Sequence, residues 1–327
     1  MLVSIYCITY NHERFIAQAI ESFLMQQTNF DFEIVIGEDC STDNTASIVK
    51  EYAQKYPNII KARCNEVNIG MHANSLKTLQ ECSGVYIAKC DGDDYWTDPC
   101  KLQKQVNFLE ENLDFSICFH PPKIWNENEQ RFYDYEYVNS IPPVTDIYCL
   151  ASGNYVPTQT VMYRKNDTAI KELALINTPM TDYTFCMLQA KYGKIQKLPD
   201  SMSVYRIHEG GYYQRKINYD NMVRSMNMLK SMFPYFEDGV VTILKKQYFR
   251  IADQVLENFL TTNNYLQVKE IIRDLYNIDP NMTIETVSTK ISTFKQELES
   301  LKKSKFFILY KIIVRPIKYL QKTLQKN

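Results

Sequence analysis

Glycine is scarce in this sequence, with 9 glycines among 327 residues. Neither a G-x-G-x-x-G pattern nor a Walker A sequence occurs, so the glycine-rich phosphate loops of dinucleotide-binding and P-loop proteins have no support here. The nine cysteines form no C-x-x-C pair, and several lie in apolar stretches. That pattern is typical of reduced core cysteines and argues against a disulfide framework or a zinc site.

Long apolar segments and a charge excess of one sign are also missing. No window reaches the roughly 18 uninterrupted apolar residues of a spanning helix. The N-terminus has no basic stretch, so we expect no signal peptide and a cytoplasmic protein. Lys and Arg total 37 against 38 Asp and Glu, a net charge of −1, which argues against nucleic acid as a partner of the chain as a whole. A composition that is 45% hydrophobic and 23% charged is that of a globular protein.

The first hundred residues alternate short apolar runs with helical patterns. Strands are expected at 3–9, 32–36, 59–62 and 85–88. Apolar residues at helical spacing predict helices from Ile16 to Leu24, around Ile48 to Tyr52 and around Leu76 to Leu79. Ser41 is the expected N-cap of the second helix. This alternation predicts βαβ units, an α/β fold class and a mainly parallel sheet, whose ligands bind beyond the carboxyl ends of the strands.

The rest of the chain changes character twice. Further strands are expected at 116–119, 160–163 and 202–206, a helix at 182–192, and a tyrosine-rich loop or edge ribbon around 133–137. After residue 216 the pattern is helical, with a break at Asp279-Pro280. We therefore expect three parts: a domain at 1–215, a helical C-terminal region at 216–301, and a basic amphipathic tail at 302–327.

Asp91-Gly92-Asp93-Asp94 follows the expected strand 85–88 directly. Mg²⁺ and Mn²⁺ prefer oxygen ligands, often one or two carboxylates together with substrate phosphates. A strand end would hold such carboxylates on a rigid support. On its own, however, so short a motif is more often a solvated acidic turn or a helix N-cap.

Two more polar clusters follow expected strands. The run from Glu38 to Asp43 places Asp39 where its carboxylate could accept hydrogen bonds from a base or a ribose, although helix capping also explains a run of this kind. The run Thr9-Tyr10-Asn11 ends the first strand, and Tyr10 could stack on a nucleobase or simply pack. Three polar clusters at strand ends are what a nucleotide crevice requires.

A second half-site is indicated later in the chain. Asp182 opens the helix expected at 182–192 and could serve as a general base or as a partner of the helix dipole. In the run from Tyr205 to His208, Arg206 could offset diphosphate charge. His208 could ligate a metal or be a hydrogen-bonded structural residue.

Together these motifs resemble those of the family-2 glycosyltransferases with the GT-A fold. The resemblance covers about residues 1–215 and rests on the runs Ser4 to Asn11, Glu38 to Asp43, Asn68 to Gly70, Asp91 to Asp94 and Tyr205 to His208, with Asp182. It implies a Rossmann-like GT-A domain that carries out inverting sugar transfer. The donor would be a nucleotide sugar, most simply a UDP-sugar, and the acceptor a hydroxyl of a glycan or polyprenyl-linked intermediate in bacterial surface-polysaccharide synthesis.

The resemblance also implies roles for single residues. Asp182 would be the catalytic base, and the metal, Mn²⁺ or Mg²⁺, would be held by Asp93, Asp94 and His208, the sequence leaving open which aspartate touches it. The nucleotide sugar would be bound by Thr9, Tyr10, Asn11, Asp39, Asn68, Asp91 and Arg206. Two motifs depart from the family pattern: Glu38-Asp39-Cys40 stands where two aspartates followed by glycine are usual, and Thr181 stands where glycine or an acid is commoner.

Two other functions fit related folds. A sugar-nucleotidyltransferase would be expected to carry a glycine-rich basic loop after the first strand, where this chain has Thr9 to Glu13. A non-catalytic nucleotide-sugar-binding protein would be expected to lack the carboxylates, and all of them are present. The acceptor side is expected among residues 120–160, whose aromatic and polar side chains could instead merely cover the sheet: His120, Trp125, Tyr133, Tyr135, Tyr137 and Asn154.

The tail at 302–327 holds eight basic residues and no acidic one, which leaves 29 basic against 38 acidic residues in 1–301. Its basic and apolar residues recur on opposite sides of a helical pattern that Pro316 interrupts. This predicts an interfacial helix drawn to anionic lipid, placing the protein peripherally on the cytoplasmic membrane face. The alternative is a helix that packs on the helical region or on a sister subunit of a homo-oligomer.

Overall fold

The computed structural model describes residues 1–211, 219–261 and 264–300. Its main sheet begins with the four strands expected in the first hundred residues, β1 (Val3–Thr9), β2 (Phe32–Glu38), β3 (Ile60–Cys64) and β4 (Tyr86–Lys89). They pair in parallel in the order β3-β2-β1-β4. All seven residues of β1 are buried, as befits a strand in the middle of a parallel sheet that is covered on both faces.

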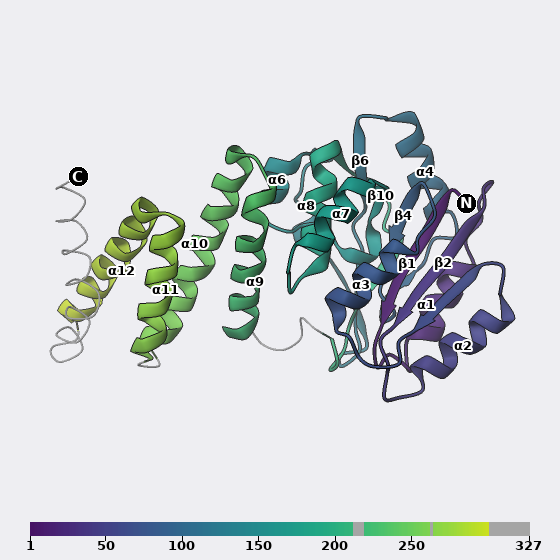
Figure 1. The fold of residues 1–327 in the computed structure, drawn as a ribbon, viewed down its shortest axis with the longest axis horizontal. Coiled ribbons are helices and arrows are strands. Elements are labelled where there is room, and N and C mark those ends of the chain that lie inside the picture. Colours follow the sequence, from purple (N-terminus) through teal and green to yellow (C-terminus); the bar gives the residue numbers. More distant parts are fainter. Residues whose placement is uncertain (212–218, 262–263, 301–327) are drawn as a thin grey trace. The chain divides into compact units, whose positions relative to one another are not determined.

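The sheet continues beyond β4 with four more strands, in the order β10 (Met162–Arg164), β6 (Phe115–Phe119), β11 (Lys194–Lys197) and β9 (Val144–Thr145). Strand β10 is antiparallel to both neighbours, β6 and β11 are parallel, and β9 is an antiparallel edge. The result is an eight-stranded, mainly parallel sheet (Figure 1), which confirms the predicted α/β fold class.

Helices between the strands bury one apolar face each. Their bounds are α1 (Ile16–Leu24), α2 (Thr45–Lys55), α3 (Met71–Gln80) and α4 (Lys101–Glu111). Helix α1 buries Ile16, Ala19, Ile20 and Phe23 at helical spacing, as predicted. The N-cap prediction for α2 was wrong: Asn44 occupies that position. The Ser41 hydroxyl instead accepts the backbone N–H of Asn11 at 2.9 Å, which ties the ends of β1 and β2 together.

A second, four-stranded sheet has the order β5 (Tyr95–Trp96), β12 (Ser203–Ile207), β7 (Lys123–Asn126) and β8 (Arg131–Asp134). Strand β12 is antiparallel to β5 and parallel to β7. The tyrosine-rich ribbon expected near 133–137 thus contributes β8, an edge strand. More important for the site, β12 is paired to the residues that directly follow the acidic turn at 91–94.

The remaining helices lie in the C-terminal two thirds of the chain. Four belong to the strand-containing part: α5 (Glu136–Asn139), α6 (Ile147–Ala151), α7 (Asp167–Leu175) and α8 (Thr181–Gln189). The others are α9 (Tyr219–Met232), α10 (Asp238–Thr261), α11 (Tyr265–Ile278) and α12 (Pro280–Ser300). The predicted break at Asp279-Pro280 falls between α11 and α12.

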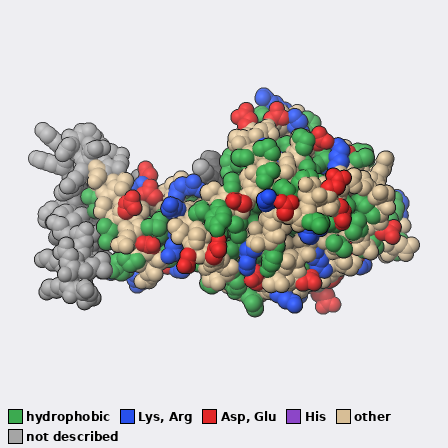
Figure 2. Space-filling view, turned by 90° about the horizontal axis from the view of Figure 1, so that it is seen from above, with side chains coloured by type: hydrophobic (Ala, Val, Ile, Leu, Met, Phe, Trp, Pro, Cys, Tyr) green, Lys and Arg blue, Asp and Glu red, His purple; other side chains and the backbone are tan. Residues whose placement is uncertain are grey.

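The chain divides into two compact units. The first runs from Met1 to Lys216 and also includes Pro234–Val240, and the second contains the helical remainder. Among the described residues, no helix is both long and apolar enough to cross a membrane. On the face drawn in Figure 2, acidic and basic side chains are interspersed over the described surface. The amphipathic tail predicted at 302–327 lies outside the described residues.

Candidate functional site

The acidic turn that follows β4 is fixed to the end of β1. The backbone N–H of Gly92 donates to the carbonyl of Ile8 at 3.0 Å. A Cβ at position 92 would lie 2.6 Å from Oγ1 of Thr9 and 2.9 Å from Cδ1 of Ile16. Glycine is therefore required here, because any larger residue would push the turn away from the strand.

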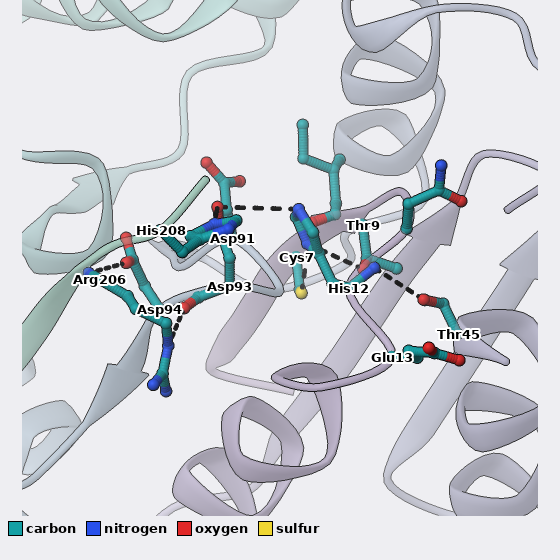
Figure 3. Close-up of polar contacts among 12 residues, drawn as sticks. Cys7, Thr9, His12, Glu13, Thr45, Asp91, Asp93, Asp94, Arg206 and His208 are labelled. Atoms are coloured by element: carbon teal, nitrogen blue, oxygen red, sulfur yellow. Dashed lines mark hydrogen bonds and ion pairs between the residues drawn. The ribbon is translucent and has the colours of Figure 1, made fainter. Parts of the chain in front are cut away.

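Asp93 lies between two histidines (Figure 3). Its Oδ2 is 3.2 Å from Nε2 of His208, which follows β12, and 3.7 Å from Nε2 of His12, which precedes α1. Burial by itself would raise the pKa of Asp93, but the two histidines outweigh it and leave that pKa lowered. Asp93 is thus a charged carboxylate whose orientation is set from both sides of the turn.

Asp94 and Arg206 hold the turn together. The Oδ1 of Asp94 accepts the backbone N–H of Arg206 at 2.7 Å, and Nε of Arg206 donates to the Asp93 carbonyl at 2.8 Å. The Arg206 guanidinium also donates to Glu127 at 2.5 Å and to Gln18 at 2.6 Å. Burial, followed by the charge of Asp93, raises the pKa of Asp94 well above its ordinary value. Arg206 therefore supports the turn, and its predicted contact with a diphosphate stays a prediction.

Asp91 and Asp182 face a lysine that the sequence patterns had not singled out. Lys89 is the last residue of β4 and 2% exposed, and its ammonium lies 3.8 Å from Oδ1 of Asp91 and is bonded to Oδ1 of Asp182. Burial raises the pKa of Asp91, and its Oδ1 has no hydrogen-bond partner among the described residues. Asp182 lies in the first turn of α8, as predicted, with its side chain 38% exposed.

These residues meet in one cavity of about 370 Å³. Its wall contains five of the predicted site residues, Asp91, Asp93, Asp94, Asp182 and Arg206. The lining also includes two residues expected on the acceptor side, Tyr135 and Asn154, together with Tyr205 and the segment from Tyr155 to Gln159. In contrast, His120 is fully buried and Trp125 packs against Phe132.

Asp39 organises the loop that follows β3. Its Oδ1 accepts the backbone N–H of Ile69 at 3.0 Å and Nδ2 of Asn65 at 2.8 Å, and its Oδ2 accepts the backbone N–H of Gly70 at 2.9 Å. Nδ2 of Asn68 donates to the Asp39 carbonyl at 3.1 Å. Asp39 and Asn68 thus come together as part of one loop, with the Asp39 carboxylate fixing its shape.

The end of β1 carries the other predicted nucleotide contacts. Oγ1 of Thr9 lies 3.2 Å from Nδ1 of His12, and Oδ1 of Asn11 accepts the backbone N–H of Thr42 at 2.8 Å. Tyr10 lies between them and is 42% exposed. Cys40 adopts a φ of 58°, the left-handed region that favours glycine, which accounts for the glycine usual at this position. Thr9 and Asn11 therefore hold the end of β1 in place, and Tyr10 presents a partly exposed ring there, but none of the three is among the residues that line the cavity.

A family model described as glycosyl transferase family 2 matches residues 4–192. The chain belongs to this family. An uncharacterized protein of Mycobacterium tuberculosis is 37% identical over 216 residues, 64% of this chain and 60% of its own length. The family-2 glycosyltransferase described here thus matches only about three fifths of that relative.

The name of a second relative states an activity. The UDP-Glc:alpha-D-GlcNAc-diphosphoundecaprenol beta-1,3-glucosyltransferase WfaP of Escherichia coli is 28% identical over 233 residues, 71% of this chain and 86% of WfaP. Among solved structures, S. aureus TarS in complex with UDP-GlcNAc has a TM-score of 0.64 at 19% identity, covering 88% of this chain and 84% of that one. This likeness confirms the GT-A fold expected from the motifs.

The side chains of the site show whether this family-2 glycosyltransferase could bind the predicted metal ion. Among the described residues, no group of three or more His, Cys, Asp or Glu side chains is arranged to hold a cation by itself. The Oδ1 of Asp91, which takes part in no hydrogen bond among the described residues, and the charged carboxylate of Asp93 nevertheless lie in one cavity wall. Such a pair fits a hard cation that takes its remaining oxygen ligands from substrate phosphates.

Proposed function

We propose that this chain is an inverting, divalent-cation-dependent glycosyltransferase. It transfers a sugar from a UDP-sugar to a hydroxyl of a lipid-linked glycan acceptor in surface-polysaccharide synthesis. One observation carries the proposal: Asp91 and Asp93, suited to the donor diphosphate, share a single cavity with Asp182, suited to the acceptor. The cavity thus offers both halves of a transfer site.

Asp182 is the proposed general base. Its carboxylate takes the proton of the acceptor hydroxyl as the acceptor oxygen attacks the anomeric carbon from the face opposite the diphosphate. The new bond joins that oxygen to the anomeric carbon, and the bond from the anomeric carbon to the diphosphate oxygen breaks, its electron pair leaving with the nucleoside diphosphate. General-base assistance of this kind contributes roughly 10²–10⁴ in rate. The partial exposure of Asp182 in the cavity supports this role.

Asp91 and Asp93 are the proposed ligands of Mn²⁺ or Mg²⁺, which when bound would neutralise charge on the leaving diphosphate. Between the two aspartates left open by the sequence, Asp93 is better suited, because Oδ1 of Asp94 already accepts the backbone N–H of Arg206. His208, at 3.2 Å from Oδ2 of Asp93, would orient that carboxylate. Asp94 and Arg206 would serve mainly to hold the turn.

The donor and acceptor classes draw support from two sources. TarS has been solved with UDP-GlcNAc bound, and the name of WfaP specifies a UDP-sugar donor and a diphosphoundecaprenol-linked acceptor. Tyr135 and Tyr205 line the cavity, where their rings could pack on sugar faces. A basic tail drawn to anionic lipid would bring the enzyme to such an acceptor.

A screen of nucleotide sugars tests this function. Each UDP-, GDP- and dTDP-sugar is measured for thermal stabilisation of the full chain with Mn²⁺, with Mg²⁺ and with EDTA. We expect one UDP-sugar to raise Tm in the presence of the cation only, and to be hydrolysed slowly. Stabilisation that is equal in EDTA would contradict the metal assignment, and the absence of any response to all donors would contradict the donor class.

A further inference from the structure

Lys89 is a buried charge at the centre of the site. It is the last residue of β4, opposite Tyr6 of β1 in the sheet register, and the other three residues of β4 are apolar or aromatic and buried. The Lys89 side chain is 2% exposed, and its ammonium lies 5.1 Å from the centre of the Tyr6 ring. Burying an ammonium is costly unless it is paired, so its partners indicate what it does.

Those partners are carboxylates of the proposed transfer site. The ammonium is bonded to Oδ1 of Asp182 and lies 3.8 Å from Oδ1 of Asp91. Asp91 and Asp182 both line the cavity, with Asp93 and Asp94 close by. Lys89 therefore connects the acids proposed for the donor side with the acid proposed for the acceptor side.

Resting on the proposed function, we propose that Lys89 is the positioning residue of the catalytic base. By binding Oδ1 of Asp182, it orients the carboxylate so that Oδ2 is left for the acceptor hydroxyl. Its positive charge also lies in contact with the carboxylate that is proposed to take up the proton. Without Lys89, the Asp182 carboxylate loses an opposite charge in contact with it, and such a charge favours the ionised form of a carboxylate.

The other titratable groups near the pair do not supply this charge. They are Tyr6 and Cys7 of β1, Cys90 next to Lys89, and His72 of α3, which is bonded to Thr181. Burial raises the pKa of Tyr6, of Cys7 and of Cys90, and lowers the pKa of His72. All four are therefore neutral near pH 7. The guanidinium of Arg206, a further cation in the cavity wall, is bonded to Glu127 and Gln18.

The direction of the pH shift expected in Lys89→Met follows from the positive charge that the substitution removes. Replacing Lys89 by Met removes a positive charge in contact with Asp182. The variant should therefore raise the pKa of Asp182, and the base should stay protonated up to a higher pH. An opposite charge in contact commonly lowers the pKa of a carboxylate by about 1–3. The acidic limb of the kcat/KM profile should therefore move up by about one unit or more in Lys89→Met, with activity partly restored at alkaline pH.

The test compares pH profiles of sugar transfer for wild type, Lys89→Met and Lys101→Met. Lys101 is the matched control, because it is also a fully buried lysine, but its ammonium is bonded to Gln105 and lies over Trp96. In Lys101→Met, the acidic limb of the kcat/KM profile should lie at the same pH as in wild type. A Lys89→Met profile that is only lowered, with its limb unmoved, would overturn the proposal. If Lys89→Met does not fold, Lys89→Gln is measured with the same expectation.

Asp182→Asn distinguishes a failure of the Lys89 proposal from a failure of the base assignment itself. If it is inactive while Lys89→Met leaves the limb in place, only the Lys89 proposal fails. If it transfers sugar at the wild-type rate, the base assignment fails and the Lys89 proposal with it. A stability readout is independent of turnover. Asp182→Asn removes the nearer of the two carboxylates that compensate the buried ammonium, so the change in Tm caused by Lys89→Met should be more favourable in the Asp182→Asn background than in wild type. Equal changes would contradict the pairing.

Discussion

The backbone N–H of Arg206 donates to the Asp94 carboxylate at 2.7 Å, joining residues 112 positions apart. This bond attaches β12 to the acidic turn, and the pairing of β12 with β5 continues the connection. It also delivers His208 to Asp93. The carboxylates proposed for the donor are therefore held from two sides, by β1 and by β12.

Gly92→Ala should damage the donor site. Its Cβ would lie 2.6 Å from Oγ1 of Thr9, so the turn that carries Asp91 and Asp93 must shift. We expect UDP-sugar affinity to fall about tenfold or more in calorimetry, which corresponds to about 1.4 kcal/mol. Gly153→Ala is the control, because a Cβ there would approach nothing nearer than 3.5 Å. Equal affinities of the two variants would argue against a fixed turn.

Asp39→Asn should loosen the loop from Asn65 to Gly70. The new amide has only one oxygen, so the bond from the backbone N–H of Ile69 or the bond from that of Gly70 to residue 39 is lost. A hydrogen bond to a charged group contributes about 1.5–3 kcal/mol. We expect a lower Tm and weaker UDP binding. Asp167→Asn, at an exposed carboxylate, should change neither. Unchanged UDP binding in Asp39→Asn would separate this loop from the donor site.

Glu33 should contribute stability that depends on pH. Burial alone would raise its pKa, but hydrogen bonds from Lys61, Ser4 and Ser83 lower that pKa from 4.5 to about 2. A lowered carboxylate pKa gives stability that is complete above about pH 4.5 and is lost as pH falls toward about 2. Glu33→Gln should therefore unfold at lower temperature than wild type at pH 7, and the difference should shrink near pH 3. A difference independent of pH would refute this account.

The tail at 302–327 should bind anionic membranes. Its eight basic residues against no acidic one predict that the full chain sediments with vesicles containing phosphatidylglycerol but not with neutral vesicles. A chain ending at residue 301 should stay in the supernatant. A full-length variant with Gln at Lys311, Arg315, Lys318 and Lys322 separates charge from length. Equal sedimentation of the shortened and full chains would exclude the tail as the membrane contact.

Much of the fold could be predicted because buried parallel strands leave a strong signal. The runs at 3–9 and 32–36 are mostly apolar, and both became strands that are buried on both faces. Edge strands such as β9 and β8 were harder, because they are short and half exposed. The N-cap prediction at Ser41 failed for a tertiary reason: its hydroxyl accepts the N–H of Asn11, 30 residues away, and the helix starts later.

The sequence predicted those site residues whose type and position after a strand indicate a binding site. The order of strand-end clusters predicted that Asp91, Asp93 and Asp182 would meet, and they line one cavity. Lys89 and His12 were missed. A lysine at a strand end normally reaches solvent, and nothing local indicates that Lys89 is buried against a carboxylate 93 positions away. His12 likewise gains its meaning only when β12 brings His208 to the other side of Asp93.

The most direct test of the central claim is the rate of sugar transfer by Asp182→Asn. With the donor identified by the screen and a diphosphate-linked polyprenyl glycan as acceptor, we expect the rate to fall by roughly 10² or more. Donor affinity in calorimetry should stay within about threefold of wild type, because Asp182 is assigned to the acceptor. A transfer rate within a few-fold of wild type would contradict the assignment of Asp182 as the base.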